Sequence, residues 1–119
     1  MIGCDIVNIK RIENIFKKNK IKFLNRIFSK EELDCLNQNI NSIAGYYAAK
    51  EAASKALGCG ICELCNFYDI KICKDERNKP FIVFSEKIIK EFNISRANLS
   101  ISHDAGIAMA VVMLEKNNA

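Results

Sequence analysis

Residues 42–57 are apolar on nearly every side of the helix that they are expected to form. The segment reads SIAGYYAAKEAASKAL, with Ser42 as a suitable N-cap residue and Gly58 suitable for ending the helix in the left-handed conformation. A helix that is apolar all round has to be buried. The segment therefore predicts a long central helix around which the rest of the chain must pack.

The length of the chain limits what can surround this helix. With 119 residues, half of them apolar, we expect one domain, residues 1–119, with a real core. A domain of this size buries a modest share of its surface, so an oligomer is consistent with its length. The sequence contains no signal peptide and no apolar run of 18 residues, which favours a soluble, cytoplasmic protein with its six cysteines reduced.

The other segments predict short helices followed by an antiparallel sheet. Helices are expected after Asn8, around Phe23 to Ile27, after Ser29 (with Glu32 in a capping box) and after Ser85. Strands are expected at residues 1–7, 67–73, 81–84, 99–103 and 107–114. The last strand is apolar on both faces, so it should be central or buried against another subunit. The sum is an α+β fold.

Two carboxylates lie where apolar residues dominate. Asp5 belongs to an alternating apolar strand, where a carboxylate must be paired or bind a cation; a strand-end aspartate in contact with solvent or a lysine is the simpler interpretation. Glu51 and Lys55 lie one turn apart at the edge of a face formed by alanines, and they also suit a surface ion pair. Magnesium takes one or two protein carboxylates, so Asp5 and Glu51 together would suit it. Whether the two residues meet is not visible in the sequence.

The first third of the chain is strongly basic. Its cations face a single acid, Glu13, before Glu31; they are Lys10, Arg11, Lys17, Lys18, Lys20, Lys22, Arg26 and Lys30. A solvated face is one interpretation, and a docking surface for an acidic protein or a nucleic acid is the other. Aromatic residues are sparse there and resemble core residues, so stacking on bases is poorly supported.

Cysteines and one histidine leave further alternatives open. Cys59, Cys62 and Cys65, with Cys73, are spaced like part of a zinc or iron–sulfur site. Gly58 and Gly60 flank the first cysteine, which indicates a close backbone approach to a ligand. His103, the single histidine, precedes a tight turn; it suits a structural role or a phosphate contact.

Several segments, taken together, resemble the holo-acyl-carrier-protein synthases, the small 4′-phosphopantetheinyl transferases. They run in order over nearly the whole chain: residues 3–7 with 10–12, residues 28–33, residues 44–61, Lys79-Pro80 and residues 99–104. The Lys-Glu-Ala-x-x-Lys-Ala core of residues 50–56 beside an N-terminal Gly-x-Asp is the specific part.

The resemblance implies an activity. The family moves 4′-phosphopantetheine from coenzyme A to a serine of apo acyl carrier protein, which then serves fatty acid biosynthesis, and releases adenosine 3′,5′-bisphosphate. Asp5 and Glu51 match its magnesium ligands, and Lys55 matches a lysine near the transferred phosphate; these three would be the catalytic residues. The general base stays open between Glu51, acting through a water, and a water alone.

The resemblance also implies binding residues and an assembly. Contacts with coenzyme A are expected from Lys50, Lys55, Gly58, Gly60 and His103, and docking of the acidic carrier from Arg11, Lys18 and Lys22. Many relatives carry a basic residue where Tyr46 stands, and Lys50 or another lysine is expected to substitute for it. The small members of the family are homotrimers with sites at subunit junctions. No nucleic acid or membrane partner is implied; a nucleic-acid-binding module and a thiolate–metal protein remain the alternatives.

Overall fold

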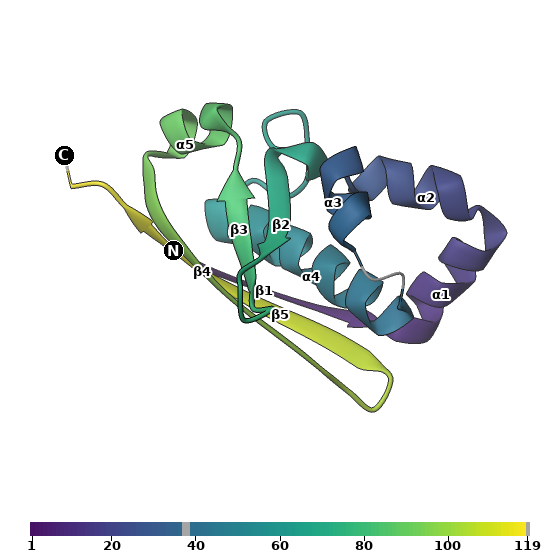
Figure 1. Ribbon diagram of the computed structural model, residues 1–119. Helices are drawn as coiled ribbons and strands as arrows, with labels where there is room; N and C mark the ends of the chain where they lie inside the picture. The colour runs from purple at the N-terminus through teal and green to yellow at the C-terminus, as the bar shows by residue number, and fades with distance from the viewer. Residues whose placement is uncertain (37–38, 119) are drawn as a thin grey trace.

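The central helix α4 (Ile40–Leu57) lies between a three-stranded sheet on one side and a two-stranded hairpin with short helices on the other (Figure 1). This arrangement is taken from a computed structural model, which describes residues 1–36 and 39–118. Twelve of the helix's eighteen residues are buried. The helix is therefore buried, as the apolar composition of its surface predicted.

The three-stranded sheet is antiparallel, with the order β1 (Ile2–Asn8), β5 (Ile107–Lys116), β4 (Ile94–Asp104). The strand that is apolar on both faces, β5, is the central one. This is one of the two placements that its sequence predicted. Asp5 of β1 lies opposite Ala110 of β5. The sheet carries one face against α4 and leaves the other uncovered within this chain.

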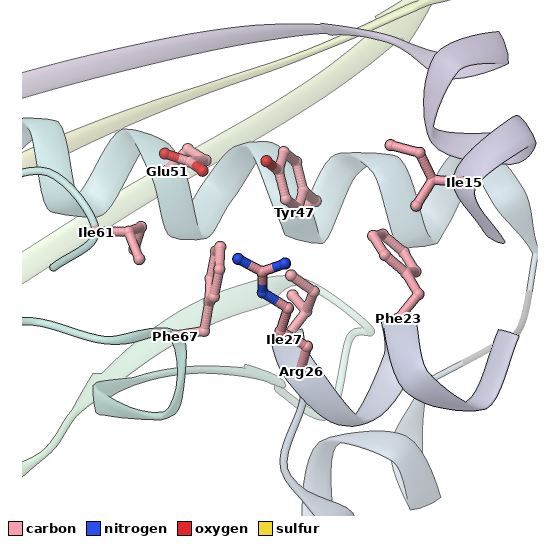
Figure 2. A pocket seen from close by; sticks show the side chains of 8 residues that line it. All are labelled: Ile15, Phe23, Arg26, Ile27, Tyr47, Glu51, Ile61 and Phe67. Atoms are coloured by element: carbon pink, nitrogen blue, oxygen red, sulfur yellow. The ribbon is translucent and has the colours of Figure 1, made fainter. Parts of the chain in front are cut away.

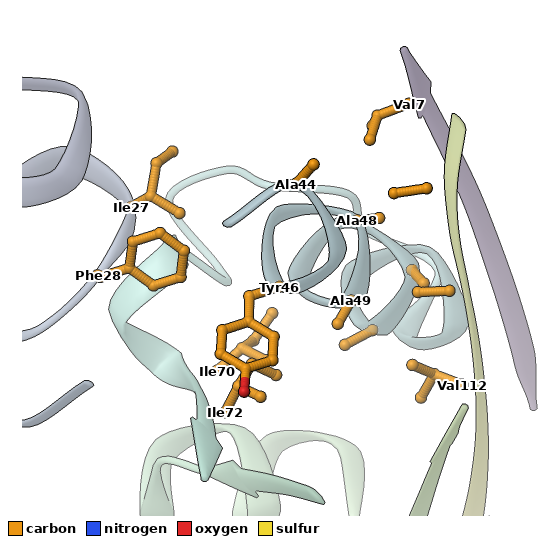
Figure 3. Close-up of a cluster of buried hydrophobic side chains, with 14 of the residues drawn as sticks. Val7, Ile27, Phe28, Ala44, Tyr46, Ala48, Ala49, Ile70, Ile72 and Val112 are labelled. Atoms are coloured by element: carbon orange, nitrogen blue, oxygen red, sulfur yellow. The ribbon is translucent and has the colours of Figure 1, made fainter. Parts of the chain in front are cut away.

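Alanines make the contact between α4 and the sheet. Ala48 and Ala49 lie on the side of the helix that faces the sheet, where Val112 points toward them, whereas Tyr46 points toward the hairpin (Figure 3). The small residues of this side of the helix therefore let β1 approach it closely. The approach is so close that only glycine fits at residue 3, the second residue of β1.

Replacing Gly3 by Ala should destabilise the fold strongly. The new Cβ would clash with the carbonyl oxygen of Ala52 and lie 2.5 Å from the backbone nitrogen of Ala56, and backbone atoms of a buried helix cannot move aside cheaply. We expect a loss of about 3 kcal/mol in urea unfolding. Gly45→Ala is the matched control, because its Cβ would meet the Cγ2 methyl group of Ile101 at 2.9 Å, which is a side-chain atom and not a backbone atom. Equal losses in the two variants would contradict this account.

The short helices begin at the caps that the sequence predicted. Before α1 (Ile9–Lys18) the Asn8 side chain accepts a hydrogen bond from the Arg11 backbone N–H at 3.1 Å. Ser29 and Glu32 form the complete capping box of α3, and Ser85 caps α5. The remaining bounds are α2 Lys20–Ile27, α3 Lys30–Cys35 and α5 Glu86–Phe92.

Several element boundaries differ from the prediction. The largest difference is in β4, which is expected at residues 99–103 and spans Ile94–Asp104. The N-cap of α4 is Asn39, whose side chain accepts from the Asn41 backbone N–H, so the helix begins before Ser42. The segment expected as one strand from residue 67 starts as a 3₁₀ turn, η1 (Phe67–Asp69), followed by β2 (Ile70–Lys74), which pairs with β3 (Pro80–Phe84). Asn66 and Asp69 cap this turn reciprocally, and such local hydrogen bonds compete with an extended backbone.

The outer face of the three-stranded sheet is apolar and exposed. Ile2, Ile6 and Met113 are 66%, 62% and 56% exposed, and Met109 lies beside them. An apolar strip of this kind on a small chain marks a contact surface. None of the helices in the described ranges is long and apolar enough to cross a membrane.

Candidate active site

A pocket of about 340 Å³ opens beside the middle of α4 (Figure 2). Helices α1 and α2 form one end of it, and the loop after α4 together with η1 forms the other. Its lining is mostly apolar, with one carboxylate and one guanidinium: Ile15, Phe23, Arg26, Ile27, Tyr47, Glu51, Ile61 and Phe67. The pocket therefore offers a negative and a positive side chain on facing walls of an apolar chamber.

Glu51 projects from α4 one turn after Tyr47, and both side chains face the pocket (Figure 2). Burial raises the pKa of the Tyr47 phenol, and the Glu51 carboxylate raises that pKa further, while the Arg11 guanidinium opposes them. Tyr47 therefore stays protonated at neutral pH and is available as a hydrogen-bond donor. The sequence does not single out Tyr47, although its position four residues before Glu51 is a signal for a place in the site.

Asp5 and Lys55 form an ion pair beside this pocket. The Lys55 Nζ atom lies 2.8 Å from Asp5 Oδ1, and the Asp5 side chain is only 13% exposed. The hydrogen bond to Asp5 raises the pKa of Lys55, and the charge of Glu51 raises it as well. The two carboxylates therefore act on one ammonium group. The pair that the sequence suggested within the helix, Glu51 with Lys55, is not the ion pair that forms.

Asp5 and Glu51 fit the coordination chemistry of magnesium. Within residues 1–36 and 39–118 no lysine, arginine or histidine forms an ion pair with Glu51, and Asp5 uses only Oδ1 for Lys55. In the same ranges no three His, Cys, Asp or Glu side chains are arranged to hold a metal ion. Magnesium needs no such cluster, because it keeps waters and substrate phosphates in its shell beside one or two carboxylates.

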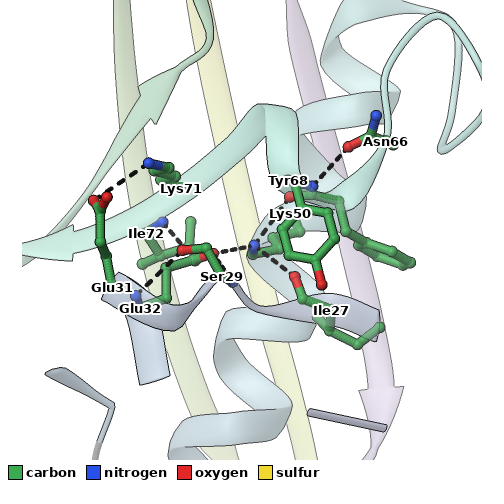
Figure 4. Close-up of polar contacts among 10 residues, drawn as sticks. Ile27, Ser29, Glu31, Glu32, Lys50, Asn66, Tyr68, Lys71 and Ile72 are labelled. Atoms are coloured by element: carbon green, nitrogen blue, oxygen red, sulfur yellow. Dashed lines mark hydrogen bonds and ion pairs between the residues drawn. The ribbon is translucent and has the colours of Figure 1, made fainter. Parts of the chain in front are cut away.

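Lys50 has a different place from the one expected. Its side chain is completely buried, and Nζ donates to Glu32 Oε1 at 2.8 Å, to the Ile27 carbonyl at 2.8 Å and to the Phe67 carbonyl at 3.0 Å (Figure 4). Burial lowers its pKa, against the opposing effect of Glu32. All three donors of the ammonium are occupied, so we withdraw Lys50 from the residues expected to contact coenzyme A.

The loop after α4 provides a wall of the pocket. Gly58 ends the helix with φ = 85°, and Gly60 also has a positive φ, of 68°. A Cβ at either position would meet open space, so the two glycines are needed for backbone conformation rather than for room. The side chain that reaches the pocket from this loop is Ile61.

His103 lies away from this pocket. It is the last residue but one of β4 and lines a separate hollow of about 240 Å³ with Ser102, Asp104 and residues of the outer sheet face. The described chain therefore does not bring His103 to Glu51. A joint role of these two residues would need His103 from another copy of the chain.

The basic residues cover α1 and α2 next to the pocket. Arg11, Lys18 and Lys22 are exposed, and the two lysines line a shallow hollow of about 200 Å³ that continues from the main pocket. Arg26 borders both hollows, and its guanidinium points toward Tyr47 (Figure 2). The sequence counted Arg26 in the basic patch but gave no sign that it enters the site.

Tyr46 is buried and cannot replace a phosphate-binding cation. Its ring packs against Ile70 and Ile72 (Figure 3), and its hydroxyl has no hydrogen-bond partner among the described residues. The ammonium of Lys74 lies 5.8 Å from the centre of the ring, within cation–π range. The cation beside Tyr46 is therefore Lys74 of β2, and Lys50 points elsewhere, to Glu32.

Comparisons with known proteins agree with this architecture. The sequence model of the 4′-phosphopantetheinyl transferase superfamily matches residues 1–112. The holo-[acyl-carrier-protein] synthase of Campylobacter lari is 53% identical over 117 residues, which cover 98% of this chain and 100% of the relative.

Two solved structures are similar along the whole chain. The crystal structure of Helicobacter pylori holo-[acyl-carrier-protein] synthase in complex with coenzyme A has a TM-score of 0.93 and 49% identity, covering 97% of this chain and 100% of that one. A holo-(acyl-carrier-protein) synthase from Bacillus anthracis, in complex with CoA (3′,5′-ADP), has a TM-score of 0.82 and 36% identity over 98% of this chain and 96% of that one. The chain belongs to the 4′-phosphopantetheinyl transferase superfamily and, within it, to the holo-[acyl-carrier-protein] synthases.

Proposed function

We propose that this enzyme transfers 4′-phosphopantetheine from coenzyme A to a serine of apo acyl carrier protein, and so supplies holo carrier for fatty acid biosynthesis. The observation that carries the proposal is the pocket with Glu51, flanked by the Asp5–Lys55 pair and bordered by basic helices. Relatives crystallised with coenzyme A have the same fold along the whole chain.

Each residue of the site has a task in this reaction. The serine hydroxyl attacks the β-phosphate of coenzyme A, and adenosine 3′,5′-bisphosphate leaves. Lys55 places a positive charge beside the phosphates, and Asp5 holds the ammonium in position at 2.8 Å. The apolar walls formed by Ile61 and Phe67 exclude water from the reacting phosphate. Magnesium, held by Asp5 and Glu51, would neutralise charge on the phosphate oxygens.

The direct test is the mass of the carrier protein. Apo carrier incubated with the enzyme, coenzyme A and magnesium should gain one phosphopantetheine group at its serine, and omission of magnesium should prevent the gain. A carrier that a known transferase modifies but this enzyme leaves unchanged would refute the proposal. Salt-sensitive binding to nucleic acid without coenzyme A binding would favour the alternative of a nucleic-acid module.

Docking of the acidic carrier is assigned to Arg11, Lys18 and Lys22. Reversing the charge of Lys18 with Lys18→Glu should raise KM for the carrier about tenfold, with KM for coenzyme A and kcat little changed. The effect should shrink as salt is added, because the charges are exposed. Lys90→Glu, on the exposed surface of α5, is the control and should leave both KM values unchanged. An equal effect of the two substitutions would place docking elsewhere.

We also propose a homotrimer with active sites at the subunit junctions. The exposed apolar strip of the outer sheet face, which includes Ile6 and Met113, needs a cover. A neighbouring subunit packed there would bring its own side chains to the open side of Asp5. His103, which lies apart from Glu51 in one chain, could then contact the coenzyme bound by another chain. We place the assembled enzyme in the cytoplasm.

The assembly is tested by the mass of the particle in solution. Light scattering should give three chains for the parent protein and one for Met113→Asp, because a carboxylate buried at the interface would be unpaired. Ile21→Asp alters an equally apolar, 74% exposed residue of α2 and should leave the trimer intact. A monomeric parent protein, or a trimeric Met113→Asp variant, would contradict the proposed interface.

A further inference from the structure

The loop between α4 and η1 contains three cysteines that the proposed reaction does not use. Cys59, Cys62 and Cys65 follow one another at intervals of three residues, and all three are free thiols. The described residues hold no arrangement of three such ligands around a metal position. The spacing of these cysteines therefore needs an explanation other than metal binding.

Cys62 and Cys65 are held opposite each other by the backbone. The Cys62 N–H donates to the Cys65 carbonyl at 2.9 Å, and the Cys65 N–H donates back to the Cys62 carbonyl at 3.2 Å. Reciprocal bonds of this kind define a hydrogen-bonded antiparallel pair, in which the Cα atoms lie about 5.5 Å apart. Disulfides span Cα separations of about 4.4–6.8 Å, so the backbone already has the separation that a bond between these residues needs.

The two thiols differ in access to solvent. Cys62 is exposed, whereas Cys65 is fully buried. Burial, together with the nearby Cys59, raises the pKa of Cys65 to about 12, and burial and Cys62 raise the pKa of Cys59. Cys59 is half-buried, with its Sγ 3.9 Å from the Ser54 carbonyl oxygen. An oxidant from solvent therefore meets Cys62 first, and an inner thiol is in place to complete the reaction.

We propose that Cys62 and Cys65 form a dithiol site that low-molecular-weight disulfides, such as oxidised glutathione, convert reversibly into an intraloop disulfide. The Cys62 thiolate attacks one sulfur of the oxidised glutathione, forming a mixed disulfide and releasing one glutathione thiolate. Cys65 attacks the Cys62 sulfur and releases the second glutathione as a thiolate, which takes up the proton that the Cys65 thiol gives up. Two cysteine thiols are thereby oxidised, and one glutathione disulfide is reduced to two thiols.

The site adjoins the pocket. Ile61, which precedes Cys62, lines the pocket on the same side as Phe67. Closing the bond requires the exposed Cys62 side chain and the buried Cys65 side chain to turn toward each other beside Ile61. We expect the oxidised protein to bind coenzyme A more weakly; this consequence, unlike the disulfide itself, rests on the proposed function.

The disulfide is tested without coenzyme A or carrier. The protein is incubated with oxidised glutathione over a range of ratios to reduced glutathione, quenched in acid, and alkylated under denaturing conditions. We expect two of the six cysteines to escape alkylation, peptide mapping to join Cys62 to Cys65, and dithiothreitol to restore all six. Cys65→Ala should stop at the mixed disulfide on Cys62, and Cys62→Ser should leave both Cys59 and Cys65 reduced.

Cys4→Ser and Cys35→Ser, at exposed cysteines outside the loop, are the matched controls and should retain the disulfide. A persistent glutathione adduct on Cys62 of the parent protein, or a bond from Cys62 to Cys59, would overturn the assignment. Coenzyme A binding to the oxidised and reduced protein is then compared by calorimetry. Equal affinities would overturn the coupling to the pocket, and no binding by either form would instead count against the proposed function.

Discussion

Glu51→Gln should lower kcat/KM for carrier modification by at least about 10³-fold while leaving the fold intact. Glutamine keeps the length of the side chain and its place one turn after Tyr47 in the pocket. It removes the negative charge with which Glu51 would hold magnesium against the coenzyme phosphates. Continuous assays of carrier modification, with magnesium varied, measure the loss, and circular dichroism checks that the helix content is unchanged.

The control for this prediction is Glu91→Gln, the same substitution at an exposed residue of α5 outside the pocket. It should keep full activity at every magnesium concentration. Should Glu51→Gln retain turnover comparable to that of Glu91→Gln, Glu51 has no place in the metal site, and the proposed role of the pocket must be revised.

Lys50→Met should cost about 3–5 kcal/mol of stability, because it leaves the Glu32 carboxylate buried without a counter-charge. It also removes the donor to the carbonyl groups of Ile27 and Phe67, which hold the end of α2 and the start of η1 against α4 (Figure 4). Ile27 and Phe67 both line the pocket, so surviving protein should bind coenzyme A more weakly. Urea unfolding at one fixed protein concentration gives the free energy, since the stability of the proposed trimer would depend on concentration.

Two comparisons separate the buried network from a general effect of losing a lysine. Lys55→Met is the same change on the same helix, at a side chain that is 51% exposed, and should cost no more than about 1 kcal/mol. Adding Glu32→Gln to Lys50→Met removes the unpaired charge and should recover part of the loss. Equal losses for Lys50→Met and Lys55→Met would show that the network contributes nothing specific.

The helix starts and the buried helix could be predicted because their causes are local. Asn8, Ser29 and Ser85 cap the helices that follow them through hydrogen bonds that span three residues. The predicted start of α4 at Ser42 is wrong for a related reason, since Asn39 has an equally good capping side chain and nothing local distinguishes the two residues. The turn at Asn66 was missed because apolar residues after it suggested a strand throughout.

The site was predicted only in part. The motif drew attention to Asp5, Glu51 and Lys55, and the structure brings Asp5 and Lys55 together from positions 50 residues apart. The motif did not indicate Arg26 or Tyr47. The direction in which α2 crosses α4 decides which exposed cation of α2 faces the pocket. The roles in metal binding, coenzyme binding and carrier docking stay predictions.

The two lysines of α4 show most clearly what the sequence determined by itself and what the tertiary structure decided. The sequence established that 50–56 is a helical segment of a phosphopantetheinyl transferase and that both lysines lie on it, five residues and about 140° apart. Only the tertiary structure assigned Lys50 to the interior, beside Glu32, and Lys55 to the surface, beside Asp5. The reason is physical: a helix that is apolar on every side does not specify which of its faces the sheet, the hairpin and the short helices will cover.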